Sequence, residues 1–482
     1  MKKEEREHFN LAEELRKQKI AEEKRRLILK DVKEKIEKEK TMKLSIKEGS
    51  FASIMYGLGD YYIIPYALAL NANNFQIGLL KSFSGLLPPI SQLYGSKLME
   101  KFSRKRIILT YISLQALTWL PIIFLSLLFW KSLLVSYLPY FLIAFYTLYA
   151  IFGSIATPAW FSLLGDIVPD NIRGKYFGKR NRITGAVGLV STLTAAFLLD
   201  FFKTKGYVLI GFSILFFLAS IARLISAYYF KKHYQPKFKQ KKKFYFSFLQ
   251  FLKGVKKYNF TKFSVFASCM HFSIMIASPF FAVYMLDKLG FSYTTFMFIT
   301  LSSSIANILL MPIWGKFSDK YGRKETMLLS TVLISIMPIL WLFSSSPYYL
   351  LLPNIIGGIG WAGFSLASFN FIYDSTGPEK RALCVSYYNI LLGIGTFIGS
   401  ALGGLILQGI PLLDLTMNKF FVVFFISALL RGLTSMIFLP HIKEVRKVRK
   451  FHPITSFKRF EHGMFHEIIG GFIVKPKKTQ NK

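Results

Sequence analysis

The chain has 482 residues, of which 52% are hydrophobic, and its formal net charge is +36. A charge of this size can indicate nucleic-acid binding, but the basic residues lie between long apolar segments and no nucleic-acid module is recognisable, so we expect no nucleic-acid partner. Only two cysteines occur, and no cluster of metal ligands accompanies them, which argues against a structural disulfide, a metal site or a cofactor.

Residues 3–40 precede the apolar region and are rich in Glu, Lys, Arg, Leu and Ala, without Gly or Pro. This composition predicts a helix. We expect a solvated helix within a charged cytoplasmic tail over residues 1–48, and a coiled coil or a membrane-surface helix stays open as an alternative. The first 48 residues contain no apolar stretch, so we expect no cleavable signal peptide.

Twelve apolar segments follow, and a helix crosses a membrane with about 20 such residues. They predict an all-α, polytopic membrane protein whose twelve transmembrane helices form two pseudo-symmetric six-helix bundles, residues 49–230 and 263–440. A basic cytoplasmic linker, 231–262, joins the bundles, and a basic cytoplasmic tail, 441–482, follows them. The predicted spans are roughly 50–70, 75–99, 107–129, 135–165, 177–200, 206–230, 263–286, 292–315, 325–345, 348–374, 382–407 and 418–440.

The basic residues are distributed unevenly between the two sides of the predicted bundle. Of the 62 Lys and Arg residues, 53 lie in tails and loops on one side, and five lie in loops on the other. Basic loops stay preferentially in the cytoplasm. We therefore expect a multi-pass protein of the plasma membrane with both termini cytoplasmic, whose basic face attracts anionic lipid headgroups.

The second six segments repeat the first six. The stretch 100–105 matches the stretch 319–324 at an offset of 219. Two related halves place a site between them, near the bilayer midplane, that can open to either side in turn. Five further identities share an offset of 208, and they pair Asp166 with Asp374, Arg173 with Arg381, Asn181 with Asn389, Gly185 with Gly393, and Arg223 with Arg431.

Residues 315–324, between the eighth and ninth segments, fit the pattern G-x-x-x-D-x-x-G-R-K. At this motif the chain resembles the major facilitator superfamily, whose signature loop lies between helices 2 and 3 and recurs between helices 8 and 9. The first copy, residues 96–105, keeps the acid and the basic pair but has serine in place of both glycines. The resemblance covers about residues 50–440 and implies transport by alternating access, without indicating a substrate.

The chemistry of this motif fits a gate. Gly322 tolerates positive φ, Asp319 can accept hydrogen bonds from a neighbouring helix N-terminus, and Arg323 can pair with a carboxylate such as Asp374. The resemblance implies the same gating role, with contacts closed in the outward-facing state and broken in the inward-facing state; alternatively these charges only set topology. The expected gating residues are Glu100, Arg104, Asp166, Arg173, Gly315, Asp319, Gly322, Arg323, Lys324, Asp374 and Arg381.

Ionisable residues within a span are costly and usually face the protein interior or a water-filled cavity. Asp60, in the first span, is a candidate for proton coupling or cation binding; the alternative is a structural pair with Lys81 on the second span. His271, in the seventh span, is a second proton-coupling candidate because imidazole titrates near neutral pH; the alternative is a packing residue whose hydrogen bonds are satisfied. The repeated Arg223 and Arg431 favour structural bracing.

Several further polar and aromatic residues are candidates to face a central cavity and contact the substrate. They are Tyr61, Lys81, Gln92, Trp160, Asn307, Trp361, Asn370 and Tyr387. A different pattern, Gly395, Gly399 and Gly403 at four-residue spacing, predicts the close approach of another helix.

These features predict a secondary active transporter that moves a small-molecule substrate, with protons as the coupling ion and a monomer as the functional unit. We do not expect an enzyme, because no catalytic constellation lies at one depth. A transporter-like receptor or scaffold that binds a ligand without flux, or a lipid flippase, stays open. The fifth span, residues 177–200, lacks the proline of drug:proton antiporter signatures, so substrate and direction are undetermined.

Overall fold

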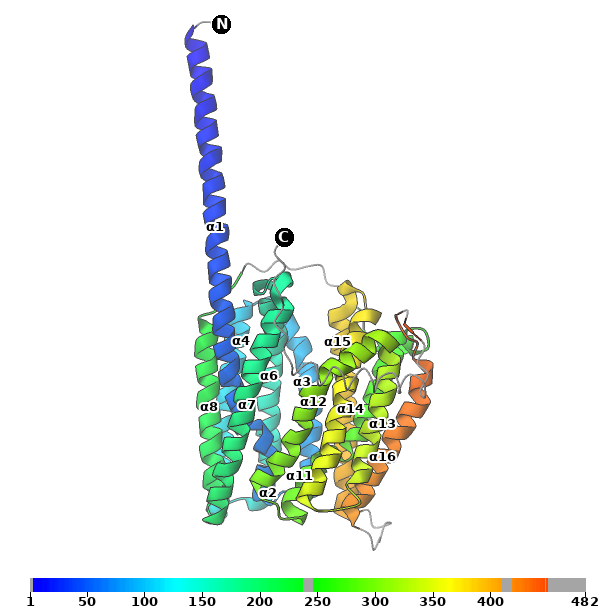
Figure 1. The fold of residues 1–482 in the computed structure, drawn as a ribbon. Coiled ribbons are helices and arrows are strands. Elements are labelled where there is room, and N and C mark those ends of the chain that lie inside the picture. The colour runs from blue at the N-terminus through cyan, green and yellow to red at the C-terminus, as the bar shows by residue number, and fades with distance from the viewer. Residues whose placement is uncertain (1–2, 237–245, 410–417, 447, 450–482) are drawn as a thin grey trace, which may run out of the picture.

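The computed structural model describes residues 3–236, 246–409, 418–446, 448 and 449. Within these residues helix is the only regular secondary structure. The long axes of the helices run side by side, and the N-terminal helix projects beyond one end of the bundle (Figure 1). We call that end the α1 end and the other the opposite end.

The first half of the chain supplies the helices on one side of the bundle. Its elements are α1 (Lys3–Leu58), a 3₁₀ turn (Asp60–Tyr62), α2 (Ile63–Ala69), α3 (Asn74–Leu98), α4 (Arg104–Leu117), α5 (Trp119–Trp130), a 3₁₀ turn (Val135–Tyr137), α6 (Leu138–Ile167), a 3₁₀ turn (Asp170–Ile172), α7 (Arg173–Thr204) and α8 (Val208–Lys231).

The second half supplies the other side. Its elements are α9 (Phe248–Lys253), a 3₁₀ turn (Gly254–Lys256), α10 (Asn259–Met275), α11 (Ser278–Val283), a π-helical turn (Tyr284–Lys288), α12 (Tyr293–Tyr321), α13 (Arg323–Leu340), α14 (Pro347–Ser375), α15 (Pro378–Gly409), α16 (Lys419–Phe438) and a 3₁₀ turn (Leu439–His441).

Corresponding helices in the two halves begin with side-chain caps. The Asn73 side chain accepts from the backbone N–H of Gln76 at the start of α3, and Ser292 accepts from that of Thr295 at the start of α12. Such caps satisfy backbone donors that the first turn of a helix leaves without an intrahelical partner. The two halves therefore fix the starts of their second membrane helices by the same chemistry.

All twelve predicted spans fall on helical segments of the described chain. Nine helices among the described residues are long and apolar enough to cross a membrane. The other three predicted spans fall on the end of α1 with α2, on α3, and on α13. The α13 helix has only 18 residues and begins with Arg323, Lys324 and Glu325. The α3 helix carries polar residues that face a cavity described below. Both helices are therefore less apolar than an isolated membrane helix.

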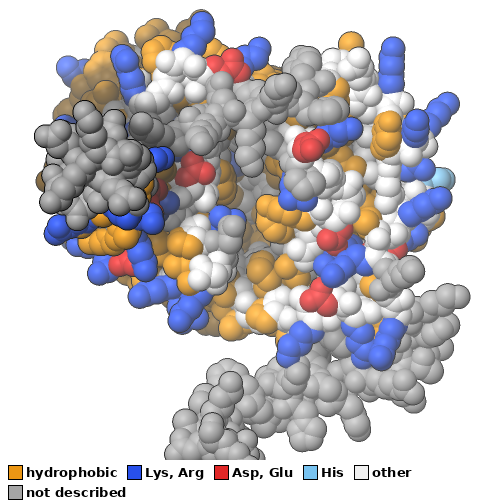
Figure 2. Space-filling view, turned by 90° about the horizontal axis from the view of Figure 1, so that it is seen from above, with side chains coloured by type: hydrophobic (Ala, Val, Ile, Leu, Met, Phe, Trp, Pro, Cys, Tyr) orange, Lys and Arg blue, Asp and Glu red, His pale blue; other side chains and the backbone are white. Residues whose placement is uncertain are grey.

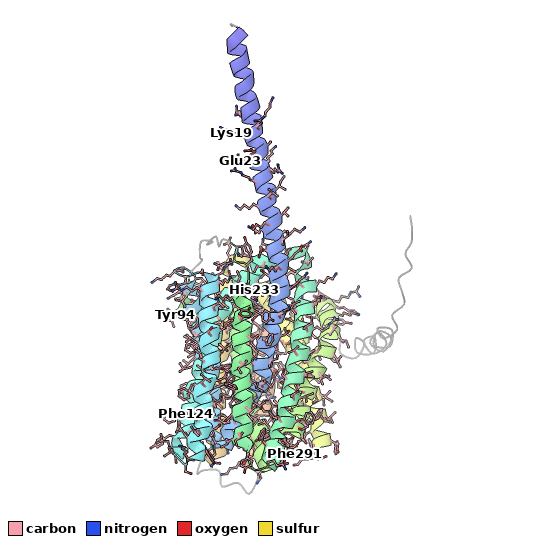
Figure 3. All side chains as sticks on the ribbon, turned by 90° about the vertical axis from the view of Figure 1, so that its left-hand side faces the viewer. Lys19, Glu23, Tyr94, Phe124, His233 and Phe291 are labelled. Atoms are coloured by element: carbon pink, nitrogen blue, oxygen red, sulfur yellow. The ribbon has the colours of Figure 1, made fainter. Side chains whose placement is uncertain are left out.

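The charged tail and the start of the first membrane span form one continuous helix of 56 residues, α1. At about 1.5 Å per residue this helix is roughly 84 Å long. Lys19 and Glu23 project from its free part, and His233 lies where it enters the bundle (Figure 3). There Thr41 accepts from the Tyr234 N–H at 2.9 Å. Burial lowers the pKa of His233, and its ring stacks on Phe230.

The two halves pack against each other chiefly through α3 with α15 and through α7 with α12. The three glycines at four-residue spacing, Gly395, Gly399 and Gly403, lie on α15 but contact α10 instead of α3. They lie against the backbone of Ser268, Phe272 and Ile276. A Cβ at Gly399 would overlap the carbonyl oxygen of Phe272. The predicted close helix approach is present, and it joins two helices of the second half.

Replacing Gly399 with alanine should destabilise the protein by about 1–3 kcal/mol, because a packed backbone has to move to accommodate the new methyl group. The matched control is Gly432→Ala on α16, where a Cβ meets nothing within 4 Å. The midpoint of thermal unfolding in detergent measures both. An unchanged midpoint for Gly399→Ala would contradict the close approach of α15 and α10.

Candidate functional site

The first membrane segment is interrupted at Gly59. Helix α1 ends at Leu58, one 3₁₀ turn follows over Asp60–Tyr62, and α2 resumes the helical direction. A Cβ on Gly59 would overlap the indole ring of Trp119, so the glycine allows this ring to pack against the break. The sequence predicted a continuous span here, and the packing of Trp119 shows why a glycine occupies the position.

The corresponding segment of the second half is also interrupted. Helix α10 ends at Met275 and α11 begins at Ser278, with Pro279 in its first turn. Proline cannot donate a backbone hydrogen bond, so the helix breaks before it. Interrupted helices at corresponding positions of two repeated halves point to a binding site, because their backbone groups are free to face a cavity.

Both breaks line one central cavity of about 730 Å³ between the halves. Asp60 and Tyr61 come from the first break, and Met275, Ser278 and Pro279 come from the second. Helices α3, α4, α6, α12 and α15 complete the walls. A volume of this size is in the range of small-molecule sites, so the cavity can hold a small solute in contact with both halves.

Asp60 and Lys81 are the two charged residues that line the central cavity. The Tyr146 hydroxyl donates to Asp60 Oδ1 at 3.0 Å, and Tyr149 stacks on Tyr146 at 5.5 Å. Asp60 and Lys81 lie too far apart for a salt bridge of 4.0 Å or less. The two charges still act on each other electrostatically, so the structural Asp60–Lys81 pair stays an alternative, and both groups face the cavity.

Three of the four tyrosines that line this cavity were not predicted from the sequence. Tyr146 and Tyr149 lie three residues apart on α6 and Tyr56 lies on α1, one turn before Asp60. Residues three or four apart share one face of a helix. Tyrosines at that spacing within a predicted span, together with a charged residue elsewhere, were the signal that could have identified them.

The other predicted cavity residues divide into two groups. Tyr61 and Lys81 line the central cavity, whereas the remainder are not among its lining residues: Gln92, Trp160, Asn307, Trp361, Asn370 and Tyr387. Tyr387 is 4% exposed and its hydroxyl donates to the Phe246 carbonyl of the linker. It was predicted to face a cavity but packs among linker aromatics, because the linker folds back onto α15.

His271 does not line the central cavity either. Its ring meets the ring of Trp361 edge-on, with 6.2 Å between centroids. The pair links α10 to α14 away from the break in the second half. Of the two proton-coupling candidates, the geometry therefore places only Asp60 in the cavity wall.

At the α1 end the predicted gating residues form two equivalent clusters. Arg104 pairs with Asp166 in the first half. Arg323 pairs with Asp374 in the second half at 3.1 Å, the partner that the sequence suggested. Both arginines are at least 95% buried. Each of these ion pairs lies within one half and ties the start of one helix to the end of another.

A second pair of arginines repeats the same hydrogen bonds in both halves. Arg173 donates to the carbonyls of Gly165 and Val168. Arg381 donates to the carbonyls of Tyr373 and Thr376. These acceptors are also related by the offset of 208 found in the sequence. The repeat therefore extends from residue identities to the bonds that close the turn between two helices.

The carboxylate at the start of α13 differs from the one expected. Asp319 was predicted to accept from a helix N-terminus, but it lies in the last turn of α12 and accepts from Arg323 at 2.9 Å and Arg446 at 3.3 Å. Glu444 instead accepts from the Lys324 N–H at 2.9 Å. Gly322 has φ +99, which supports the predicted turn.

Glu100 and Gly315 are the remaining two predicted gating residues. Glu100 is exposed in the turn after α3, and Gly315 lies on α12 with the Leu366 side chain at 3.8 Å from the position a Cβ would take. Figure 2 views this end of the molecule, and Lys and Arg side chains lie around its rim.

At the opposite end a carboxylate joins the two halves directly. Asp200, near the end of α7, accepts from the backbone N–H groups of Tyr293 and Thr294 at 2.7 and 2.8 Å, in the first turn of α12. Lys203 lies above the Tyr293 ring at 5.4 Å. A carboxylate is favoured at a helix N-terminus by the helix dipole. This contact, which we call the Asp200 latch, closes α7 against α12, and the sequence analysis did not identify it.

The model of the Major Facilitator Superfamily matches residues 49–270 and again 263–465. The chain is 28% identical over 159 residues to multidrug resistance protein 3 of Bacillus subtilis, which is 33% of this chain and 30% of that protein. It is 27% identical over 146 residues to the class B tetracycline resistance protein of Escherichia coli, covering 30% of this chain and 34% of that protein. The matched segments thus span about a third of these relatives.

Solved structures extend the likeness to most of the chain. The nucleoside transporter NupG matches with a TM-score of 0.60 and 17% identity, over 84% of this chain and 99% of that one. A bacterial homologue of the human lysosomal transporter Spinster, in an inward-facing and unoccupied conformation, matches with a TM-score of 0.59 and 14% identity over 85% of this chain and 99% of that one. At these identities the likeness concerns the fold.

Arg323→Gln should lower the free energy of unfolding by about 1–3 kcal/mol, because it removes a buried guanidinium that donates to Ser318, Asp319 and Asp374. Arg446→Gln, which removes a half-exposed arginine from Asp319, should change it by less than about 1 kcal/mol. Chemical denaturation in detergent compares the two. Equal effects would show that the buried cluster does not hold the α1 end together.

Proposed function

Because the chain belongs to the Major Facilitator Superfamily, we propose that this membrane transporter carries a small solute through the central cavity by alternating access, with protons as the coupling ion. The observation that carries the proposal is the position of Asp60. It lies at a helix break in the cavity wall, held by Tyr146 at 3.0 Å, with both halves contributing to the same cavity.

A carboxylate at membrane depth is costly and marks an ion or proton pathway. Asp60 faces a cavity that both halves line, so a change in the packing of the halves exposes it to one side of the membrane and then to the other. Tyr146 and Tyr149, both on α6, hydrogen-bond to the Asp60 carboxylate, which faces the cavity at the break in the first segment. Proton uptake on one side and release on the other then follow the conformational cycle.

Two sets of contacts supply the gates in this proposal. The Asp200 latch closes the halves at the opposite end, while the ion pairs of the α1 end each lie within one half. This arrangement corresponds to a state closed at the opposite end. In the alternate state the Asp200 latch opens, and the predicted gating residues of the α1 end, Asp319 among them, come together between the halves, with Arg446 beside Asp319.

The basic residues around the α1 end support its placement in the cytoplasm. In the proposed topology both termini are cytoplasmic, the chain crosses the plasma membrane, and anionic headgroups contact the basic rim. The state closed at the opposite end is then inward-facing. Because the Arg323–Asp374 pair is formed in it, this pair within one half is not the contact expected to break in the inward-facing state. A monomer is sufficient, because the described residues of one chain form the whole cavity.

Asp60→Asn should abolish solute-driven proton currents in proteoliposomes, because the amide cannot exchange a proton. Solid-supported-membrane recordings with amino acids, sugars, organic acids and cationic drugs, at several pH values, measure this. Asp287→Asn, at an exposed acid of the opposite end, is the matched control and should keep its current.

Each result of that experiment has a definite meaning. Solute-dependent currents that persist in Asp60→Asn would leave transport in place and contradict the proton site. Ligand binding without any flux, measured with radiolabelled solute at equilibrium, would contradict transport and favour a receptor.

Asp200→Ala should open the opposite end more often, because the loss of a carboxylate cap costs about 1 kcal/mol and shifts a two-state equilibrium about fivefold. A cysteine placed at Thr300 in the cavity wall should then react faster with a membrane-impermeant maleimide added from that side. Asp287→Ala serves as the control. An unchanged labelling rate would show that the Asp200 latch does not hold the gate.

A further inference from the structure

A smaller cavity of about 190 Å³ lies inside the first half. Helices α1, α4, α6, α7 and α8 line it, and we call it the side cavity. Tyr56, Gly153 and Thr157 line both this cavity and the central cavity, so the two cavities are adjacent. Its other polar and aromatic lining residues, Glu48, Trp160, Arg180 and Arg223, have no part in the proposed proton site.

Arg223 is 7% exposed and lines the side cavity. Its Nε donates to Gln115 Oε1 at 2.9 Å and its Nη1 donates to Ser226 Oγ at 3.4 Å. Both partners are neutral, and Nη2 has no hydrogen-bond acceptor among the described residues. A guanidinium stays charged in proteins and carries five N–H donors. The buried side chain therefore presents donors and a positive charge to the side cavity.

The repeated arginine of the second half provides an internal comparison. Arg431 is 3% exposed, and all three of its nitrogens donate, to Ser427 Oγ at 3.1 Å, to the Ile334 carbonyl at 2.8 Å and to the Ile274 carbonyl at 3.4 Å. It braces three helices, as the sequence suggested for both arginines. Arg223 occupies the same repeat position, but its Nη2 has no acceptor among the described residues. Bracing of helices therefore does not account for all of the donors of Arg223.

A second guanidinium faces the same cavity. Arg180 donates to Glu48 at 3.3 Å and lies over the Trp160 ring at 4.9 Å. Glu48 is 4% exposed, and its other oxygen accepts from Ser226 at 3.3 Å. One carboxylate thus faces two guanidinium groups. Burying a charge without a counter-charge is strongly unfavourable, and the excess positive charge makes the side cavity suited to an anion.

The central cavity does not remove this excess. Asp60 and Lys81 contribute one charge of each sign there. The two cavities together are lined by three cationic side chains and two carboxylates, which are Lys81, Arg180, Arg223, Asp60 and Glu48. Protonation of Asp60 would raise this net positive charge further. A solute that passes through both cavities therefore experiences a net positive lining.

We propose that the side cavity is a binding subsite for the carboxylate or phosphate group of a small anionic solute, held by Arg223 and Arg180. The assignment rests on the proposed transport function and specifies its substrate class. A guanidinium fork binds such an oxyanion through two parallel hydrogen bonds. Glu48 competes with the anion for Arg180 and so lowers its affinity, which allows release toward the α1 end.

The test is binding of inorganic phosphate and, separately, of malonate to the detergent-purified chain at constant ionic strength with chloride. A ligand that binds only the folded state stabilises it by RT ln(1 + [L]/Kd) and therefore raises the midpoint of thermal unfolding as its concentration increases. The dissociation constants follow from titrations. The anion with the lower constant identifies the group, phosphate or carboxylate, that the subsite prefers.

Arg223→Gln should weaken anion binding about tenfold or more, the effect of losing a charge-assisted hydrogen bond. Arg223→Lys, which keeps the charge but loses the fork, should give an intermediate constant. Glu48→Gln should tighten binding, because it frees Arg180 from its competing carboxylate. The predicted increase in anion affinity for Glu48→Gln tests the proposal even if Arg223→Gln does not fold.

Anion affinities that are equal in wild type, Arg223→Gln and Glu48→Gln would overturn the proposal, as would the absence of stabilisation of the wild type by either anion. Loss of binding in Lys81→Gln alone would move the anion to the central cavity and would also overturn it. These measurements need no membrane or gradient, and Asp60→Asn should bind the anion at least as tightly as the wild type, because it removes a negative charge from the lining. A failure of proton coupling is thereby distinguished from a failure of the anion subsite.

Discussion

The structure depends on the requirement that backbone polar groups inside a membrane be satisfied without water. Continuous helices meet this requirement within each segment. A break is tolerated only where it is buried in protein or faces a cavity. Thr118, at the break between α4 and α5, is buried, whereas the breaks after Leu58 and after Met275 face the central cavity. The position of the candidate site follows from this constraint, because it leaves few places where non-helical backbone and an ionisable group can coexist.

The position of the first break also explains why one helix, α1, contains both the charged tail and the start of the first membrane segment. From Lys3 to Leu58 nothing interrupts α1, so the charged tail and the first membrane segment turn together. The interruption comes only at Gly59, where Trp119 packs against the backbone. A movement of the first segment at this point can therefore be transmitted to the tail outside the bundle.

Residues that are repeated in the two halves do not all have the same structural role. Arg173 and Arg381 make the same bonds to equivalent carbonyls, and the helix-end ion pairs of the two halves are also equivalent. The Arg223 and Arg431 pair differs, since one faces a cavity and the other is fully bonded to neighbouring helices. Internal symmetry therefore holds the scaffold, and departures from it indicate where the halves have separate tasks.

Local and compositional signals were sufficient for much of this protein. Apolar segments of membrane length, their repeat, and the motif from Gly315 to Lys324 determined the helical fold and the family, because each depends on neighbours in the chain. The pairing of Arg323 with Asp374 was also accessible, since the repeat placed an acid at a second helix end in both halves.

Tertiary structure alone decided which polar residues face one another. Asp60 meets Tyr146, Asp200 meets the start of α12, and Tyr387 packs on the linker instead of lining the cavity. These contacts depend on the rotation of each helix about its axis and on where helices break. An apolar stretch surrounded by lipid and other helices carries little periodic signal for that rotation, so the sequence determined the scaffold and the packing determined the site.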